Sequence, residues 1–126
     1  MREIKFRGRD EHGKWHYGDL LSWPIIRSFN GLNKEVAADT VGQFTGLKDC
    51  EEREIYEGDI VRFKLPPMVL TNEKTAVGAV VYEYGQFLVI IHALRFTIFS
   101  VINDCTVIGN VHDNPELLEA TEGGRP

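Results

Sequence analysis

Apolar and polar residues alternate along much of this chain, which is the pattern of strands that bury one face of a sheet. Residues 3–10, EIKFRGRD, alternate in this way, and residues 15–23, WHYGDLLSW, resume the alternation after a turn near Gly13. These two segments predict a hairpin. In its first strand we expect Ile4 and Phe6 to face inward and the basic residues to face solvent.

Five more segments carry strand patterns, and turn residues separate most of them. They are residues 39–49, 59–65, 76–93, 94–103 and 105–111. The run over 76–93 predicts a second hairpin, folded at Gly85. Near the end of the chain, Asn114 is expected to cap a short helix that begins at Pro115.

Strands outnumber helices heavily in this pattern, so the predicted fold class is mostly β. Residues 56–61, YEGDIV, resemble the entry to a strongly bent strand of Src-homology-3-like folds. We therefore expect a small bent sheet or open barrel of this kind, with a short C-terminal helix. The length of 126 residues suits a single domain over 1–126 or two small β subdomains.

The composition allows a packed core and narrows the range of partners. Hydrophobic residues make up 43% of the chain and charged residues 26%, and the net charge is −5. An acidic chain does not coat phosphate backbones by bulk charge. One local basic stretch, Arg2, Lys5, Arg7 and Arg9, is a candidate polyanion contact. The alternative is that these side chains form the solvated face of the first strand.

The chain is expected to work in a reducing cytoplasm. No apolar run approaches the ~20 residues that span a bilayer, so we expect no membrane contact. The second residue is already charged, which predicts that there is no signal peptide. Cys50 and Cys105 lie in unlike contexts without paired metal spacing, which predicts two free thiols.

Candidate catalytic and metal-binding residues form no recognised motif. His12 and His16 have the ligand spacing of a helix, but Gly13 between them and the hairpin context argue against a helix. Acidic residues on both sides of Cys50 disfavour a reactive thiolate. The sequence contains no nucleophile elbow, P-loop or dinucleotide-binding fingerprint. We therefore predict no metal, no cofactor and no catalytic residues.

Two Gly-Asp pairs, Gly18-Asp19 and Gly58-Asp59, each precede two branched apolar residues and follow a tyrosine directly or after one residue. Two carboxylates can share acid–base work, so an enzyme that uses Asp19 and Asp59 is one hypothesis. The favoured interpretation is structural. Glycine takes the φ that a tight turn needs, and aspartate accepts a backbone N–H within the turn. We expect both pairs to act alike as turn motifs.

Three segments in series resemble the YopX family of small proteins from bacteriophages and prophages. They are REIKFRGRD…KWHYGDL, VGQFTGLKD…EIYEGDIV and VIGNVHDNPELL, at the start, middle and end of the chain. The resemblance implies a mostly β fold, self-association and no settled biochemical activity, and no catalytic residues come with it. Arg9 stands where the family usually has an aromatic residue. The turn over 50–53 lacks the family's glycine, so we expect it to avoid a positive φ.

These features together predict a phage- or prophage-derived accessory protein of the bacterial host cytoplasm that self-associates and binds a host or phage protein. We expect the homo-oligomer to form partly through residues 94–102, LRFTIFSVI, or the preceding hairpin, because unpaired strand edges invite pairing. A nucleic-acid binder that uses the basic N-terminal strand is an alternative. It is not favoured, since the aromatic residues of 76–94 have no Lys or Arg among them. The enzyme hypothesis is the second alternative.

Overall fold

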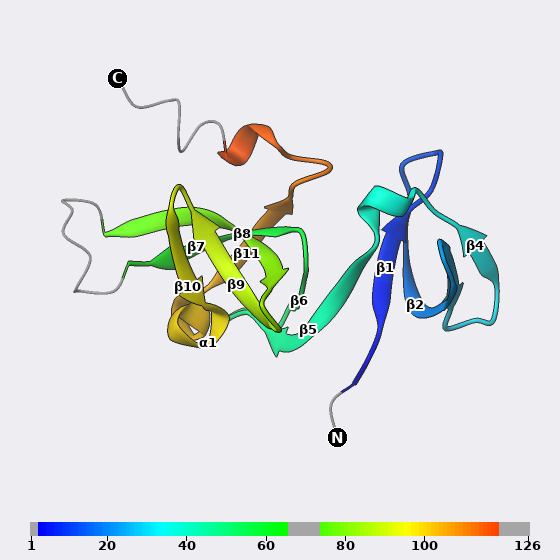
Figure 1. Ribbon diagram of the computed structural model, residues 1–126, viewed down its shortest axis with the longest axis horizontal. Coiled ribbons are helices and arrows are strands. Elements are labelled where there is room, and N and C mark those ends of the chain that lie inside the picture. Colours follow the sequence, from blue (N-terminus) through cyan, green and yellow to red (C-terminus); the bar gives the residue numbers. More distant parts are fainter. Residues whose placement is uncertain (1–2, 66–73, 119–126) are drawn as a thin grey trace. The chain divides into compact units, whose positions relative to one another are not determined.

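The computed structural model describes residues 3–65 and 74–118 of the chain. The prediction of a mostly β fold is confirmed, because the elements form two antiparallel sheets and few helical turns (Figure 1). Neither sheet closes into a barrel. No helix in the described part of the chain is long and apolar enough to cross a membrane.

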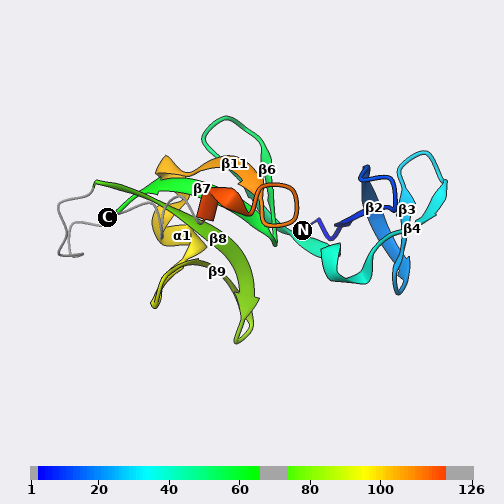
Figure 2. The same ribbon diagram turned by 90° about the horizontal axis from the view of Figure 1, so that it is seen from above.

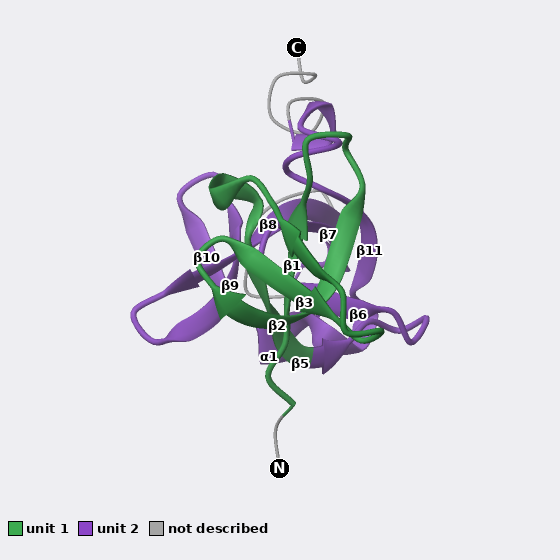
Figure 3. Cartoon of the chain, turned by 90° about the vertical axis from the view of Figure 1, so that its right-hand side faces the viewer, with its two compact units in different colours: residues 1–46 green, residues 47–126 purple. Residues whose placement is uncertain are grey.

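The chain divides into two compact units, Met1–Gly46 and Leu47–Pro126 (Figure 3). We call them the N-unit and the C-unit. Each has its own buried apolar side chains, which are described separately below.

The N-unit is built from short strands joined by tight turns. Its elements are β1 (Phe6–Arg9), β2 (Trp15–Ser22), β3 (Ile25–Ser28), β4 (Asn33–Glu35), the 3-10 turn η1 (Ala38–Thr40) and the first part of β5 (Gly42–Lys48), and their strand order is β4-β3-β2-β1-β5. β1 and β2 form the predicted hairpin, with Arg9 opposite Trp15 at its closed end. Ile26 and Val36 are buried, and Val36 fills the space above Gly8, where a Cβ would collide with it.

The expected orientation of β1 is wrong. Ile4 is 57% exposed, whereas Lys5 and Arg7 are 7% and 6% exposed. The reason is that both cations lie over aromatic rings: the Lys5 Nζ is 4.9 Å from the centre of the Phe44 ring, and the Arg7 guanidinium is 4.8 Å from that of Trp15. Cation–π contacts and long apolar stems allow such side chains to take the inner face of a strand.

The C-unit holds the second sheet. Its elements are β6 (Glu54–Tyr56), β7 (Asp59–Lys64), β8 (Thr75–Glu83), β9 (Gln86–Ile91), β10 (Leu94–Thr97), α1 (Ile98–Val101), the 3-10 turn η2 (Ile102–Asp104) and β11 (Thr106–Asn110), and the strand order is β10-β9-β8-β7-β11. β5 continues into this unit and neighbours β6. β8 bends along its length (Figure 2), and Gly78 in β8 lets β9 approach, since a Cβ there would lie 2.7 Å from the Ile90 carbonyl oxygen.

The predicted hairpin over 76–93 is confirmed. Its turn is Tyr84-Gly85, and both residues have positive φ, 52° and 82°. A two-residue turn with two positive φ angles is the type I′ turn, whose twist matches that of antiparallel strands.

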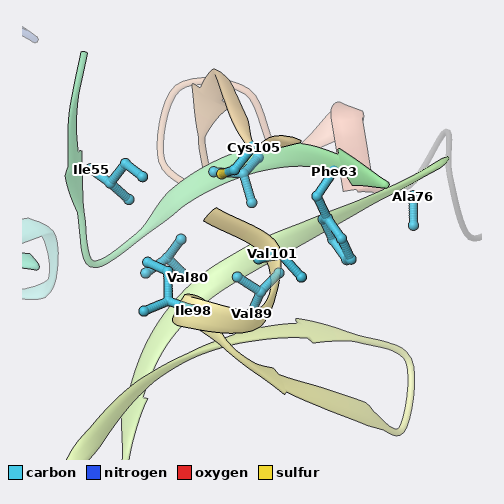
Figure 4. Close-up of a cluster of buried hydrophobic side chains, with 9 residues drawn as sticks. Ile55, Phe63, Ala76, Val80, Val89, Ile98, Val101 and Cys105 are labelled. Carbon is cyan, nitrogen blue, oxygen red and sulfur yellow. The ribbon is translucent and has the colours of Figure 1, made fainter. Parts of the chain in front are cut away.

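Buried apolar side chains of several strands and of α1 converge in the core of the C-unit (Figure 4). The cluster consists of Ile55, Val61, Phe63, Ala76, Val80, Val89, Ile98, Val101 and Cys105. The single strand predicted over 94–103 is a wrong prediction, because the chain leaves β10 and turns into α1 and η2. Ile98 and Val101 are three residues apart and both reach the core, which a helical turn permits and a strand does not.

A short helix, residues 116–118, ends the described chain. Asn114 directly precedes Pro115 and this helix, and its side-chain cap stays a prediction. Its Oδ1 atom accepts the Asn110 N–H at 3.2 Å, while its main-chain oxygen accepts the Leu117 N–H at 3.0 Å.

Candidate functional site

The turn between β1 and β2 is organised by one carboxylate, that of Asp10. Its Oδ1 atom accepts the backbone N–H groups of His12 and Lys14, each at 2.9 Å. In the backbone, Asp10 N donates to the Lys14 carbonyl at 2.9 Å and Gly13 N donates to the Asp10 carbonyl at 3.0 Å. Asp10 is 7% exposed, so this acid is a structural anchor of the hairpin.

The turn between β5 and β6 repeats the same set of bonds around Asp49. Asp49 Oδ1 accepts the N–H groups of Glu51 at 2.8 Å and Arg53 at 2.9 Å. In the backbone, Asp49 N donates to the Arg53 carbonyl at 2.8 Å and Glu52 N donates to the Asp49 carbonyl at 3.0 Å. Sequence reasoning missed both anchors. The signal was present, since FRGRD ends at Asp10 and FTGLKD ends at Asp49, so the two hairpins share Phe, Gly and Asp.

The expectation that the turn over 50–53 avoids a positive φ is wrong. Glu52 has φ 67°, and Gly13 at the equivalent position has φ 84°. A type I turn followed by a left-handed residue is a common hairpin connection, and glycine usually fills the left-handed position. This chain therefore keeps the backbone of the turn and places a residue with a Cβ where the backbone favours glycine.

The second oxygen of each anchor has a different partner. Asp10 Oδ2 lies 2.7 Å from His16 Nε2, and that hydrogen bond, with those from the backbone of Lys14 and His12, holds the pKa of Asp10 far below its ordinary value. Asp49 Oδ2 accepts the Val107 N–H at 2.9 Å. Burial opposes ionisation of Asp49, but the backbone hydrogen bonds and the charge of Arg53 outweigh it and lower the pKa.

A pocket of about 440 Å³ lies beside the Asp10 turn. Its lining comes from that turn and from β4 and the residues after it: Asp10, Glu11, Lys34, Glu35, Val36 and Ala37. The Asp10 carboxylate already serves the hairpin, and the remaining charges are a mixture of one base and two acids. The lining thus gathers no set of side chains that would hold a substrate or a metal ion.

The two Gly-Asp pairs have different structures. Gly58 has φ 93°, and the buried Asp59 carboxylate accepts the Tyr56 N–H at 2.7 Å, which is the arrangement of a local turn. Gly18 and Asp19 lie inside β2, so the prediction that they form a turn is wrong. Glycine is needed there because a Cβ would collide with the carbonyl oxygen of Arg27.

Asp19 and Asp59, the candidate catalytic pair, also differ in environment. Asp19 belongs to the N-unit and its side chain is 65% exposed, 3.9 Å from the guanidinium of Arg27. Asp59 belongs to the C-unit and is 2% exposed. Asp19 thus lies beside a cation at the surface of its unit, whereas Asp59 accepts a backbone N–H in a buried turn, and the enzyme hypothesis stays a prediction.

The candidate polyanion contact is described only in part, because Arg2 lies outside the described residues. Lys5 and Arg7 are directed at aromatic rings, as shown above. Arg9 is half-buried. Its N–H donates to Thr40 Oγ1 at 2.9 Å, and its carbonyl accepts the Ala37 N–H at 2.8 Å. Polyanion binding by these residues stays a prediction.

The two cysteines, which the sequence could not relate, are neighbours in the C-unit. The Cys50 N–H donates to the Cys105 carbonyl at 3.0 Å. Cys50 is exposed, with its Sγ 3.3 Å from Thr106 Oγ1, whereas Cys105 is buried. Burial, followed by the charge of Asp49, raises the pKa of the Cys105 thiol to about 12. Among residues 3–65 and 74–118, no three His, Cys, Asp or Glu side chains could hold a metal ion together.

In the described part of the C-unit, the exposed large apolar side chains gather in one part of the sequence. They are Tyr82, Tyr84, Leu94 and Phe99, which are 51%, 93%, 47% and 73% exposed. All four belong to the segment that runs from the end of β8 through β9 and β10 to α1. We call this segment, residues 82–99, the meander surface. It contains the ion pair between Arg95 Nε and Glu83 Oε1 at 3.0 Å.

A family model, described as YopX protein, matches residues 5–119. The chain belongs to the YopX family. The crystal structure of protein EF1440 from Enterococcus faecalis is similar to this YopX protein, with 27% sequence identity and a TM-score of 0.58. That similarity covers 94% of this chain and 100% of the other. No curated protein matches this YopX protein.

Proposed function

We propose that this YopX protein is a self-associating protein-binding module, and that the meander surface is where copies of the chain meet. It acts as a phage- or prophage-derived accessory protein in the cytoplasm of a bacterial host. No catalytic residue or cofactor is assigned to it.

One observation supports self-association most directly. In the described part of the C-unit, all four exposed large apolar side chains lie within residues 82–99. Apolar side chains that gather on one exposed segment are typical of protein interfaces, and aromatic residues are enriched at such sites. The segment has a single Lys or Arg, Arg95, and Glu83 pairs with it. The charge balance thus favours a protein partner over a nucleic acid.

The N-unit offers a second apolar surface for a different partner. Ile4, Leu21, Trp23, Phe29 and Leu32 are all at least 45% exposed. Most of them lie in or beside the β2–β3 and β3–β4 connections, each of which joins two antiparallel strands. We propose that these connections contact a host or phage protein, so that one unit assembles the module and the other binds the partner.

The experiment compares matched pairs of substitutions. Leu94→Ser with Phe99→Ser removes two exposed apolar groups from the meander surface. Leu32→Ser with Phe29→Ser removes two exposed groups of the same residue types from the N-unit. Sedimentation equilibrium at micromolar concentration should show a lower mass for the first double variant only. An unchanged mass for the first pair, or a lower mass for the second pair only, would contradict the proposal.

A further inference from the structure

The five-stranded sheet of the C-unit has two outer strands, β10 and β11, which differ in exposure and in the hydrogen bonds at their outer edges. Every residue of β11 is half-buried, whereas three of the four residues of β10 are exposed. An outer edge with unpaired N–H and C=O groups is a template for another strand unless it is closed.

Groups of the same chain close the outer edge of β11. Asp49 Oδ2 accepts the Val107 N–H and Asn114 Oδ1 accepts the Asn110 N–H, at 2.9 and 3.2 Å. At the entry to the strand, the Cys105 carbonyl accepts the Cys50 N–H. No further strand can add to this edge without breaking these bonds.

The outer edge of β10 has no such closure within the described chain. β9 and β10 are joined by the two-residue turn His92-Ala93, with Leu94 opposite Ile91. In such a hairpin the closing pair is hydrogen-bonded and the bonded pairs then alternate. Leu94 and Phe96 therefore bond to β9, and the N–H groups of Arg95 and Thr97 point away from the sheet. The Thr97 carbonyl accepts Ser100 Oγ at 2.7 Å and, as the N-cap carbonyl of α1, also accepts the first main-chain bond of that helix, so it offers no acceptor to another strand.

We infer that a second copy of this chain pairs with β10 along this edge, antiparallel and related by a two-fold axis at Phe96. This inference rests on the proposed self-association and specifies which strands of the two copies pair. Arg95 of one copy then faces the partner copy's Thr97, and the Thr97 N–H of each copy can donate to the Arg95 carbonyl of the other. A two-fold arrangement uses the same edge on both copies and closes at a dimer.

Exposed apolar side chains lie at both ends of the β10 edge. Leu94 is the first residue of β10 and Phe99 follows the strand in α1, and they are 47% and 73% exposed. The one charge on the strand, Arg95, is neutralised by Glu83 of its own chain, so the two copies bring no unpaired like charges together.

The other short edge strand, β4, is less suited to pairing. Its three residues, Asn33–Glu35, include Lys34 and Glu35 and are all exposed. Charged side chains on a short edge strand are a device that prevents edge-to-edge association. Of the outer strands β4, β10 and β11, β10 is therefore the one whose edge is best suited to pairing.

The test uses Thr97→Pro. Thr97 has φ −63°, which proline adopts, and its N–H points away from the sheet, so the isolated chain should accept the ring. The substitution removes one outward donor from each copy. We expect the dimer dissociation constant in sedimentation equilibrium to rise about 30-fold or more, which corresponds to two lost hydrogen bonds of about 1 kcal/mol each. Thr97→Ala keeps the N–H and should leave the constant within about 3-fold.

The outcomes separate this inference from the proposed function. If folded Thr97→Pro associates like wild type while Leu94→Ser with Phe99→Ser dissociates, edge pairing is overturned and the meander surface remains the interface. A monomeric wild type overturns both. If Thr97→Pro does not fold, amide hydrogen exchange on wild type decides: the Thr97 amide should become protected as protein concentration rises, and equal exchange at all concentrations overturns the pairing.

Discussion

Replacing Asp49 by alanine should destabilise the C-unit more than the loss of any exposed acid. The Asp49 side chain is fully buried and accepts three backbone N–H groups, from Glu51, Arg53 and Val107, at 2.8–2.9 Å. Water can reach the two donors in the turn, so the loss of each of these hydrogen bonds costs about 1 kcal/mol of stability. The loss of the bond from the half-buried Val107 N–H costs about 1–2 kcal/mol. We expect Asp49→Ala to lower the free energy of unfolding by about 3 kcal/mol.

The assay is urea unfolding of the full chain, followed by far-ultraviolet circular dichroism, with Asp104→Ala as the matched control. Asp104 is an exposed acid in η2, and its loss should cost less than about 0.5 kcal/mol. Asp49→Asn should be intermediate, since its amide oxygen can still serve the turn while its amide nitrogen would face the Val107 N–H. A loss below about 1 kcal/mol for Asp49→Ala, or one equal to that of the control, would refute the anchoring role.

The same carboxylate sets a pH dependence. The pKa of Asp49 is lowered from its ordinary value of 3.8 in the folded chain, so below that pH the unfolded chain binds more protons than the folded chain. The stabilisation is complete above about pH 5 and declines as the pH falls through 4 and below. Between pH 6 and pH 3, wild type should therefore lose more unfolding free energy than Asp49→Asn. Equal losses would contradict this assignment.

Three further predictions follow from the turns and thiols. Glu52→Gly should stabilise the chain by up to about 1 kcal/mol in urea unfolding, because glycine takes φ 67° without strain, and a loss of stability would contradict the left-handed turn. Asp59→Ala should lower the free energy of unfolding by about 2 kcal/mol because it leaves the buried Tyr56 N–H without its acceptor, whereas Asp19→Ala should lower it by less than about 0.5 kcal/mol. Equal losses would contradict the different roles of the two Gly-Asp pairs. A thiol reagent should label Cys50 in the native protein and Cys105 only in urea, and rapid labelling of both native thiols would show that the core opens.

Most of the strands could be predicted from the alternation of apolar and polar residues and from turn residues, because those signals lie within a few residues of one another. The predictions failed where a contact between residues far apart in the sequence determined the structure. Lys5, which precedes β1, and Arg7 within β1 are buried because aromatic rings from other segments lie against their charged groups. Residues 98–101 turn helical because two of their apolar side chains reach the core from one helical face.

The candidate site was less accessible to sequence reasoning than the fold. The similar segments HYGDLL and YEGDIV suggest that Asp19 and Asp59 have the same role. The acids that do have the same role, as anchors of hairpin turns, are Asp10 and Asp49. What distinguishes a carboxylate that anchors a hairpin from one exposed on a strand is its set of backbone donors. Those donors are fixed only once the strands have paired.

Self-association of this YopX protein is the claim on which the proposed function depends. Sedimentation velocity of wild type across the micromolar range tests it most directly. We predict a species heavier than the 14.3 kDa chain, with a mass that falls towards that value on dilution. A single species of 14.3 kDa at every concentration would contradict the account.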